Sequence, residues 1–247
     1  MPTDREEKDL EGTKNMSRSL SETFFFDIET VANKDEKLIN VLFPAVEKKT
    51  KQDAPKNYKK EETIAKWVED RYEKDLQERE NKINRGALDI DTAIIRSIAF
   101  AVGGDTIICL VGEEKQIIKD FLDAWNNFRK DNYRGLSCGY NSINYDWSVI
   151  LRRVAIFGLA ELLLYRPNMN RFTGEIDLMN LAYNFGGAAG QKKGMKTLAK
   201  ILGIDIPAEG VDGSMVASLT DQELMWYNAS DVHVVREIFK KFNGVYL

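Results

Sequence analysis

The segment Thr23-Phe24-Phe25-Phe26-Asp27-Ile28-Glu29-Thr30 constrains the fold more than any other part of the chain. Its aromatic and β-branched residues predict a strand, and its apolar continuity predicts that this strand is central and buried. Because side chains alternate along a strand, Asp27 and Glu29 would point to one face and Phe26 and Ile28 to the other. Two carboxylates on one buried face repel each other and lose hydration, and bound cations would remove that cost. Taken alone, the pair favours a strand that simply ends at the surface, because Asp-x-Glu is a common sequence.

Hydrophobic periodicity along the rest of the chain predicts alternating strands and helices. A helical spacing of apolar residues is found in residues 61–85, 114–129, 146–157, 195–202 and 220–242. Short apolar runs predict strands at residues 93–102, 106–111, 136–140 and 175–178. Gly103-Gly104-Asp105 is typical of a hairpin turn between two of these strands. This order predicts an α/β fold in which helices cover both faces of a mixed five-stranded sheet.

The domain organisation is predicted from changes in composition. Residues 1–22 are charged and nearly free of apolar side chains, which predicts a disordered or loosely attached tail. Residues 23–247 are expected to form one domain, into which residues 31–90 are inserted after the first strand. The insertion contains a lysine-rich stretch, residues 48–60, and then the charged helix. A glycine-rich stretch, residues 186–194, is not expected to form a regular element.

Composition excludes several classes of protein. The 247 residues include 35 Lys and Arg against 39 Asp and Glu, so the net charge of −4 excludes a basic nucleic-acid coat. One histidine, His233, and two cysteines argue against a zinc site, and Cys109 and Cys138 are expected to be buried free thiols. No apolar run approaches the roughly 20 residues of a membrane span, and residues 1–21 lack the apolar core of a signal peptide. We therefore expect a cytoplasmic protein without a membrane partner.

Two further acidic features accompany the first. Asp146 follows a predicted strand and begins a helix, where aspartate is a good N-cap, and function gathers at such sheet edges in α/β proteins. Tyr227 and Asp231 are four residues apart on the last helix, so they share a face. Asp231 lies among apolar residues of that helix. Because aspartate has low helix propensity, its presence there indicates a role other than helix formation. Each feature is weak alone, but their conjunction is specific.

Three segments resemble the motifs of the DnaQ-like 3′–5′ exonucleases: Phe-Asp-Ile-Glu-Thr at 26–30, Asn-Ser-Ile-Asn-Tyr-Asp at 141–146 and Tyr-Asn-Ala-Ser-Asp at 227–231. The tyrosine four residues before the last aspartate resembles the DEDDy subgroup, because the histidine subgroup would carry histidine where this chain has Trp226. Stand-alone relatives of the family B DNA polymerase exonuclease domain, which occur in bacteria and phages, are also similar at residues 177–179, 198–203 and 211–214. A bacterial or phage-infected cell is therefore the expected setting. The resemblance does not include the charged tail or the insertion.

The resemblance implies an RNase H-like fold and phosphodiester cleavage with two divalent ions, Mg²⁺ or Mn²⁺. It implies that Asp27 bridges the two ions and that Glu29 and Asp231 complete the ion on the nucleophile side. Asp146 would hold the ion on the leaving-group side through water. Tyr227 would orient the attacking water, but the ordinary pKa of tyrosine is near 10, so the metal must do most of the deprotonation.

Contacts with the substrate are expected from polar and basic residues near these motifs. Asn141 would hydrogen-bond the substrate or fix the loop before Asp146, and Tyr145 would stack on a terminal base or pack in the core. Lysines beside the glycine-rich stretch and in residues 48–60 would contact phosphates, although a solvated charge run is equally compatible. The candidate substrate-binding residues are Asn141, Tyr145, Lys192, Lys193 and Lys196.

The function predicted from these features is hydrolysis of single-stranded DNA from its 3′ end to 5′-mononucleotides, with a replication or repair protein as a candidate partner. Two alternatives remain open. An exoribonuclease of the RNase D type would use the same residues, and the sequence has no clear reader of the 2′-hydroxyl. A non-catalytic nucleic-acid-binding module on the same fold would have no need to retain all five residues of the catalytic type. The oligomeric state is not predicted.

Overall fold

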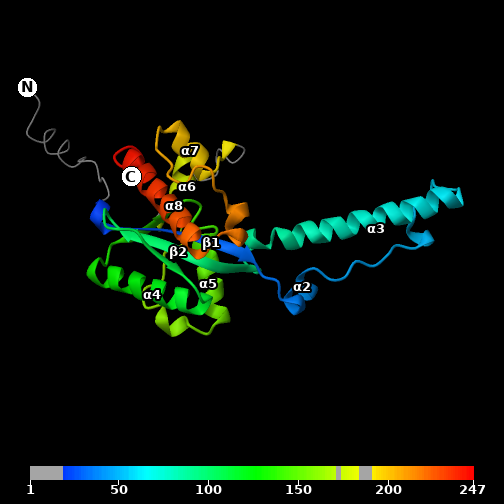
Figure 1. The fold of residues 1–247 in the computed structure, drawn as a ribbon, viewed down its shortest axis with the longest axis horizontal. Helices are drawn as coiled ribbons and strands as arrows, with labels where there is room; N and C mark the ends of the chain where they lie inside the picture. Colours follow the sequence, from blue (N-terminus) through cyan, green and yellow to red (C-terminus); the bar gives the residue numbers. More distant parts are fainter. Residues whose placement is uncertain (1–18, 171–173, 184–190) are drawn as a thin grey trace, which may run out of the picture. The chain divides into compact units, whose positions relative to one another are not determined.

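The computed structural model describes residues 19–170, 174–183 and 191–247 (Figure 1). The chain divides into two compact units, one formed by Met1–Glu29 with Ile95–Leu247 and the other by Thr30–Ile94. The insertion expected at residues 31–90 lies within the second unit. Residues 1–18 of the predicted tail and residues 186–190 of the glycine-rich stretch lie outside the described residues. In the part of the chain that is described, no helix is long and apolar enough to cross a membrane.

A five-stranded mixed sheet in the order β3-β2-β1-β4-β5 forms the centre of the fold. β1 runs parallel to β4, with Phe24 opposite Ser137, and β4 runs parallel to β5. β2 runs antiparallel to β3. The strands are β1 Thr23–Ala32, β2 Ala93–Val102, β3 Ile108–Val111, β4 Leu136–Gly139 and β5 Ile176–Asp177. The structure thus confirms an α/β fold with a mixed five-stranded sheet.

Helices lie on both faces of this sheet (Figure 1). α4 and α5 cover one face, and α6, α7 and α8 cover the other. Their bounds are α4 Glu114–Asp131, α5 Asp146–Ile156, α6 Leu178–Ala182, α7 Met195–Ile201 and α8 Asp221–Phe242. The predicted apolar face of α4 is buried, and a capping box of Thr220 and Glu223 begins α8 at its predicted position. Short 3₁₀ helices are found at Leu20–Glu22, Lys51–Asp53, Gly86–Leu88, Ala160–Leu162 and Gly213–Ser218.

The phenylalanines of β1 explain why this strand is central. Phe26 packs against Trp147 of α5 with ring centroids 5.1 Å apart, and Phe25 packs at 5.1 Å against Phe239 of α8. Successive side chains therefore bury on opposite faces, as the apolar run predicts. Burial of each ring stabilises the fold by about 2–3 kcal/mol. Asp27 and Glu29 share the parity of Phe25, so they face the α8 side.

Two predicted strands end one residue earlier than expected. β5 ends at Asp177 because the Asp177 side chain accepts hydrogen bonds from the backbone N–H groups of Met179 and Asn180, which begins α6. β4 ends at Gly139, and two residues later Asn141 adopts a left-handed backbone with φ 64°. A residue with positive φ cannot continue a strand. Both shortened ends lie next to the candidate site.

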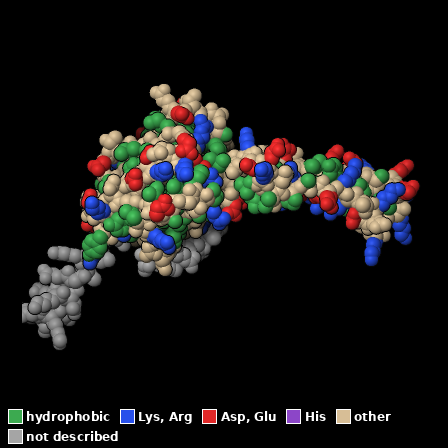
Figure 2. Space-filling model, turned by 90° about the horizontal axis from the view of Figure 1, so that it is seen from below, with side chains coloured by type: hydrophobic (Ala, Val, Ile, Leu, Met, Phe, Trp, Pro, Cys, Tyr) green, Lys and Arg blue, Asp and Glu red, His purple; other side chains and the backbone are tan. Residues whose placement is uncertain are grey.

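The second unit contains α2, Glu36–Leu42, and the long α3, Glu61–Asn84. The segment after α2 runs antiparallel to α3, because Arg79 donates to the Phe43 carbonyl at 2.9 Å while Lys48 pairs with Glu69 at 2.5 Å. None of the residues of α3 is fully buried. Basic and acidic side chains are interspersed over this unit (Figure 2). The mixed charge that the sequence predicts is therefore solvated.

Candidate functional site

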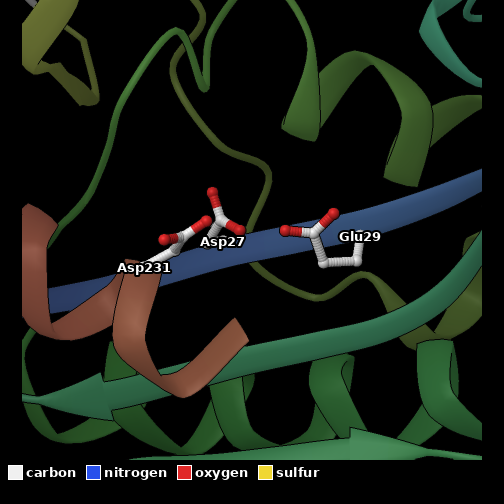
Figure 3. A group of neighbouring side chains, drawn as sticks. All are labelled: Asp27, Glu29 and Asp231. Carbon is white, nitrogen blue, oxygen red and sulfur yellow. The ribbon is translucent and has the colours of Figure 1, made fainter. Parts of the chain in front are cut away.

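Three carboxylates form the centre of the candidate site. Asp27 and Glu29 project from β1, and Asp231 projects toward them from α8 (Figure 3). One ligand oxygen from each residue lies within 4.8 Å of the other two. Glu29 and Asp231 are buried, while Asp27 is partly exposed. The arrangement places oxygen donors from two elements around one point that solvent can reach.

Tyr227 lies one helical turn before Asp231, as their spacing predicts, and it is almost fully buried. Burial raises the pKa of Glu29 and Asp231, and hydrogen bonding by the Tyr227 hydroxyl offsets part of that rise. Burial, followed by the charges of Glu29 and Asp231, raises the pKa of the Tyr227 phenol well above its ordinary range. The phenol is therefore a hydrogen-bond donor at neutral pH and is not a base.

Asp146 begins α5 directly beside β1. It is buried, and its Oδ1 accepts a hydrogen bond from the Ile28 backbone N–H at 3.2 Å. Its negative charge raises the pKa of Asp27 and of Glu29. Because β1 and β4 are parallel and their pairing ends at Phe25 and Cys138, the carboxylates of β1 and the loop after β4 meet at the same edge of the sheet. Among the described residues, Asp146 is close to the group of three carboxylates without being a member of it.

The carboxyl groups of the site ionise less readily than exposed ones, because burial raises their pKa. Burial raises the pKa of Asp146 to about 7 and that of Asp231 to about 6. Burial also raises the pKa of Asp27 and Glu29 well above their ordinary values, and the neighbouring carboxylates add to this effect. A divalent cation would relieve both the lost hydration and the repulsion.

The donor set fits a hard divalent cation. Within the described residues, Asp231 Oδ1 is buried without a hydrogen-bond partner, and such an atom is costly unless something binds it. The ligands are all carboxylate oxygens, which suit Mg²⁺ or Mn²⁺. Cys138 is a buried free thiol, as predicted, and Cys109 is a partly buried free thiol. Asp27, Glu29 and Asp231 would hold one such ion, and Asp146 would contribute to a second.

Lys196 differs most from its predicted placement. The sequence places it among lysines that contact substrate phosphates, but its Nζ points into the candidate site. The ammonium donates to the carbonyl of Ala208 at 3.1 Å and to the carbonyl of Val211. It lies 4.0 Å from Asp231 Oδ1 and 4.6 Å from the centroid of the Tyr227 ring.

The other candidate substrate-binding residues surround the site less closely. Asn141 lies in the loop after β4, and its backbone N–H donates to Asp177 Oδ1 at 3.0 Å. Tyr145 is half-buried and directly precedes α5. Lys192 and Lys193 are exposed in the segment before α7. The structure therefore brings Asn141 and Tyr145 to the sheet edge and leaves the two lysines at the surface.

Sequence reasoning missed the part that Asp177 has in this edge of the sheet. Its carboxylate accepts backbone hydrogen bonds from Asn141 and from Ile143, in addition to those that begin α6. Asp177 therefore holds the loop that leads to Asp146. An aspartate at a strand-to-helix junction predicts the N-cap of α6 but does not predict the hydrogen bonds with the loop. The contacts with the loop depend on the pairing of β4 with β5.

Comparisons with known proteins do not extend this description. No protein-family model matches the chain, and no curated protein matches it either. The chemistry of the site is therefore inferred from its own residues.

Proposed function

We propose that the protein is a metal-dependent 3′–5′ exonuclease that acts on single-stranded DNA. The observation that carries the proposal is the convergence of Asp27, Glu29 and Asp231 within 4.8 Å, with one buried carboxylate oxygen that accepts no hydrogen bond. Asp146 and Tyr227 lie beside this group, and they are the remaining two of the five residues in the exonuclease motifs that the sequence resembles. The strand order and the parallel pairing of β1 with β4 are compatible with the RNase H-like fold that this proposal implies.

Each residue has a role that follows from its position. Asp27, Glu29 and Asp231 would hold one divalent ion, and Asp146 would contribute to a second. Bound together, the two ions would activate a water and stabilise the charge on the phosphate and on the leaving 3′ oxygen. The Tyr227 hydroxyl donates toward the same carboxylates, so it can orient the attacking water without taking its proton.

A role in binding alone is less favoured. A non-catalytic module would gain nothing from buried carboxylates whose ionisation is opposed by burial and by mutual repulsion. An exoribonuclease would use the same geometry, so substrates decide between DNA and RNA. The assay therefore includes 5′-labelled single-stranded DNA, duplex DNA and RNA, each with Mg²⁺, Mn²⁺ or EDTA. A ladder that shortens from the 3′ end is expected with single-stranded DNA and metal only.

The substitution Asp27→Asn tests the metal ligands directly. It keeps the shape of the side chain but removes the shared carboxylate, so we expect turnover to fall by at least about 100-fold. Asp123→Asn is the matched control, because Asp123 is exposed on α4, on the other face of the sheet. Activity in EDTA, or near-normal activity of Asp27→Asn, would contradict the proposal.

A further inference from the structure

Lys196 comes from a helix that supplies none of the carboxylates, yet its ammonium lies among them. It donates hydrogen bonds to two backbone carbonyls, those of Ala208 and Val211. An ammonium has three donors and no acceptor, so one donor remains directed elsewhere. The neighbours on the remaining side are Asp231 Oδ1 at 4.0 Å and the Tyr227 ring at 4.6 Å from its centroid.

The surroundings of Lys196 hold the ammonium in place. α7 packs into the core through Leu198 and Ala199, which share a cluster of buried residues with Val232 of α8. The segment that carries the Ala208 carbonyl is also tied to α8, because the Ala208 N–H donates to Ser230 Oγ at 3.0 Å. The Lys196 side chain is only 23% exposed. A phosphate-gripping lysine would extend into solvent instead.

The charge of Lys196 opposes the repulsion within the acidic group. It offsets part of the rise in pKa that burial causes in Asp27, Glu29 and Asp231, and it is the one cation that acts on all three among the described residues. The ammonium also lies over the face of the Tyr227 ring, where a cation is attracted by the π electrons. Lys196 therefore contacts both a proposed metal ligand and the proposed water-orienting residue.

We propose that Lys196 is a positioning residue, which holds Asp231 and Tyr227 in place and balances the carboxylates until divalent ions bind. The inference rests on the proposed function, since it takes these carboxylates as metal ligands. Bound ions would balance the same charges and would repel the ammonium. Lys196 should therefore stabilise the fold more without metal than with it, a difference that neither a purely structural lysine nor a substrate contact would produce.

Thermal unfolding in EDTA and in saturating Mn²⁺ tests this inference. Lys196→Met keeps the length of the side chain and removes its charge. We expect it to lower Tm in EDTA by about 4 °C or more, and Mn²⁺ should restore at least about half of that loss. The control is Lys200→Met on the same helix, because Lys200 forms a surface ion pair with Glu209 at 2.6 Å. Its small effect should be the same in both conditions.

Other outcomes overturn the inference in distinguishable ways. An equal loss of Tm in EDTA and in Mn²⁺ would show a purely structural lysine. An unchanged Tm with a flatter salt dependence of DNA affinity would show a substrate contact. If Lys196→Met does not fold in EDTA, the double variant with Asp231→Asn should fold, since the charge to be balanced is gone; a double variant that stays unfolded contradicts the inference. A wild-type protein whose Tm does not respond to Mn²⁺ would instead contradict the proposed function.

Discussion

At the scale of single residues, the acidic site lowers the stability of the fold that carries it. Asp146 and Asp231 have pKa values of about 7 and about 6, and burial is the main cause of both shifts. The unfolded chain ionises the same groups near pH 4. The folded protein therefore holds protons over a pH range in which the unfolded chain has lost them. By linkage, its stability must fall as the pH rises through that range.

The pH dependence of Tm follows from this decrease in stability with rising pH. In EDTA, Tm should fall by roughly 5 °C between pH 5.5 and pH 8, because the native state loses protons that the unfolded state no longer binds. Asp231→Asn should flatten the profile near pH 6. In saturating Mn²⁺ this fall in Tm should disappear. The ions bind the deprotonated carboxylates, so they stabilise the fold most at the pH where the protons have been lost. A Tm in EDTA that is independent of pH would contradict the assigned burial of these carboxylates.

At the scale of elements, two pairs among the lysines of residues 48–60 differ in their contacts. Lys48 pairs with Glu69 at 2.5 Å, and Lys51 pairs with Glu61 at 3.1 Å, so both fasten their segment to α3. Lys59 and Lys60 directly precede α3, are exposed, and have no ion pair among the described residues. The positive end of the helix dipole repels cations, so neither lysine stabilises the helix there. This second pair is available to phosphates.

The double variants Lys59→Gln/Lys60→Gln and Lys48→Gln/Lys51→Gln each remove two positive charges. If Lys59 and Lys60 contact the backbone of single-stranded DNA, losing them should flatten the logarithmic salt slope of binding by about 1.4. The variant of the paired lysines should change the slope by less than half of that amount. Affinity measured across a salt series for both proteins compares them at equal net charge. Equal slopes would assign these lysines to a solvated surface.

At the scale of the whole molecule, the candidate site belongs to one unit. The residues assigned to metal, water and positioning all lie in the unit of Met1–Glu29 and Ile95–Leu247. Within the other unit, the Asn33 N–H donates to the Thr92 carbonyl at 2.8 Å. The chain therefore leaves the sheet and returns to it at adjacent positions, as a long insertion between two neighbouring strands requires.

Excision of the insertion is therefore expected to preserve the site. Replacing residues 34–91 by Asn-Gly would join Asn33 to Thr92 through a two-residue turn of the type that links antiparallel strands. The rise of Tm on addition of Mn²⁺ should stay within about 2 °C of that of the full chain. Affinity for single-stranded DNA should weaken, because Lys59 and Lys60 are removed. Loss of the Mn²⁺ response in a folded variant would show that the second unit shapes the site.

Local periodicity was enough to predict much of this protein. The phenylalanines of β1 bury on alternate faces, so the shared face of Asp27 and Glu29 follows from a period of two residues. Tyr227 and Asp231 share a face of α8 because the helical period is 3.6 residues. The beginning of α8 at the Thr220 capping box is equally local. These features depend on residues at most a few positions apart, so they can be predicted from the local sequence.

Packing between distant segments decided the rest. The approach of Asp231 to Asp27 depends on how α8 lies across the sheet, and the hydrogen bond of Asp146 joins residues 118 positions apart. Lys196 looks like a surface lysine in a basic stretch, and only the packing of α7 on α8 turns its ammonium inward. Asp177 holds the loop before Asp146 only because β5 pairs with β4. Such contacts form when burial of apolar surface brings whole elements together. The free energy of that burial depends on residues far apart in the sequence, so no short segment predicts it.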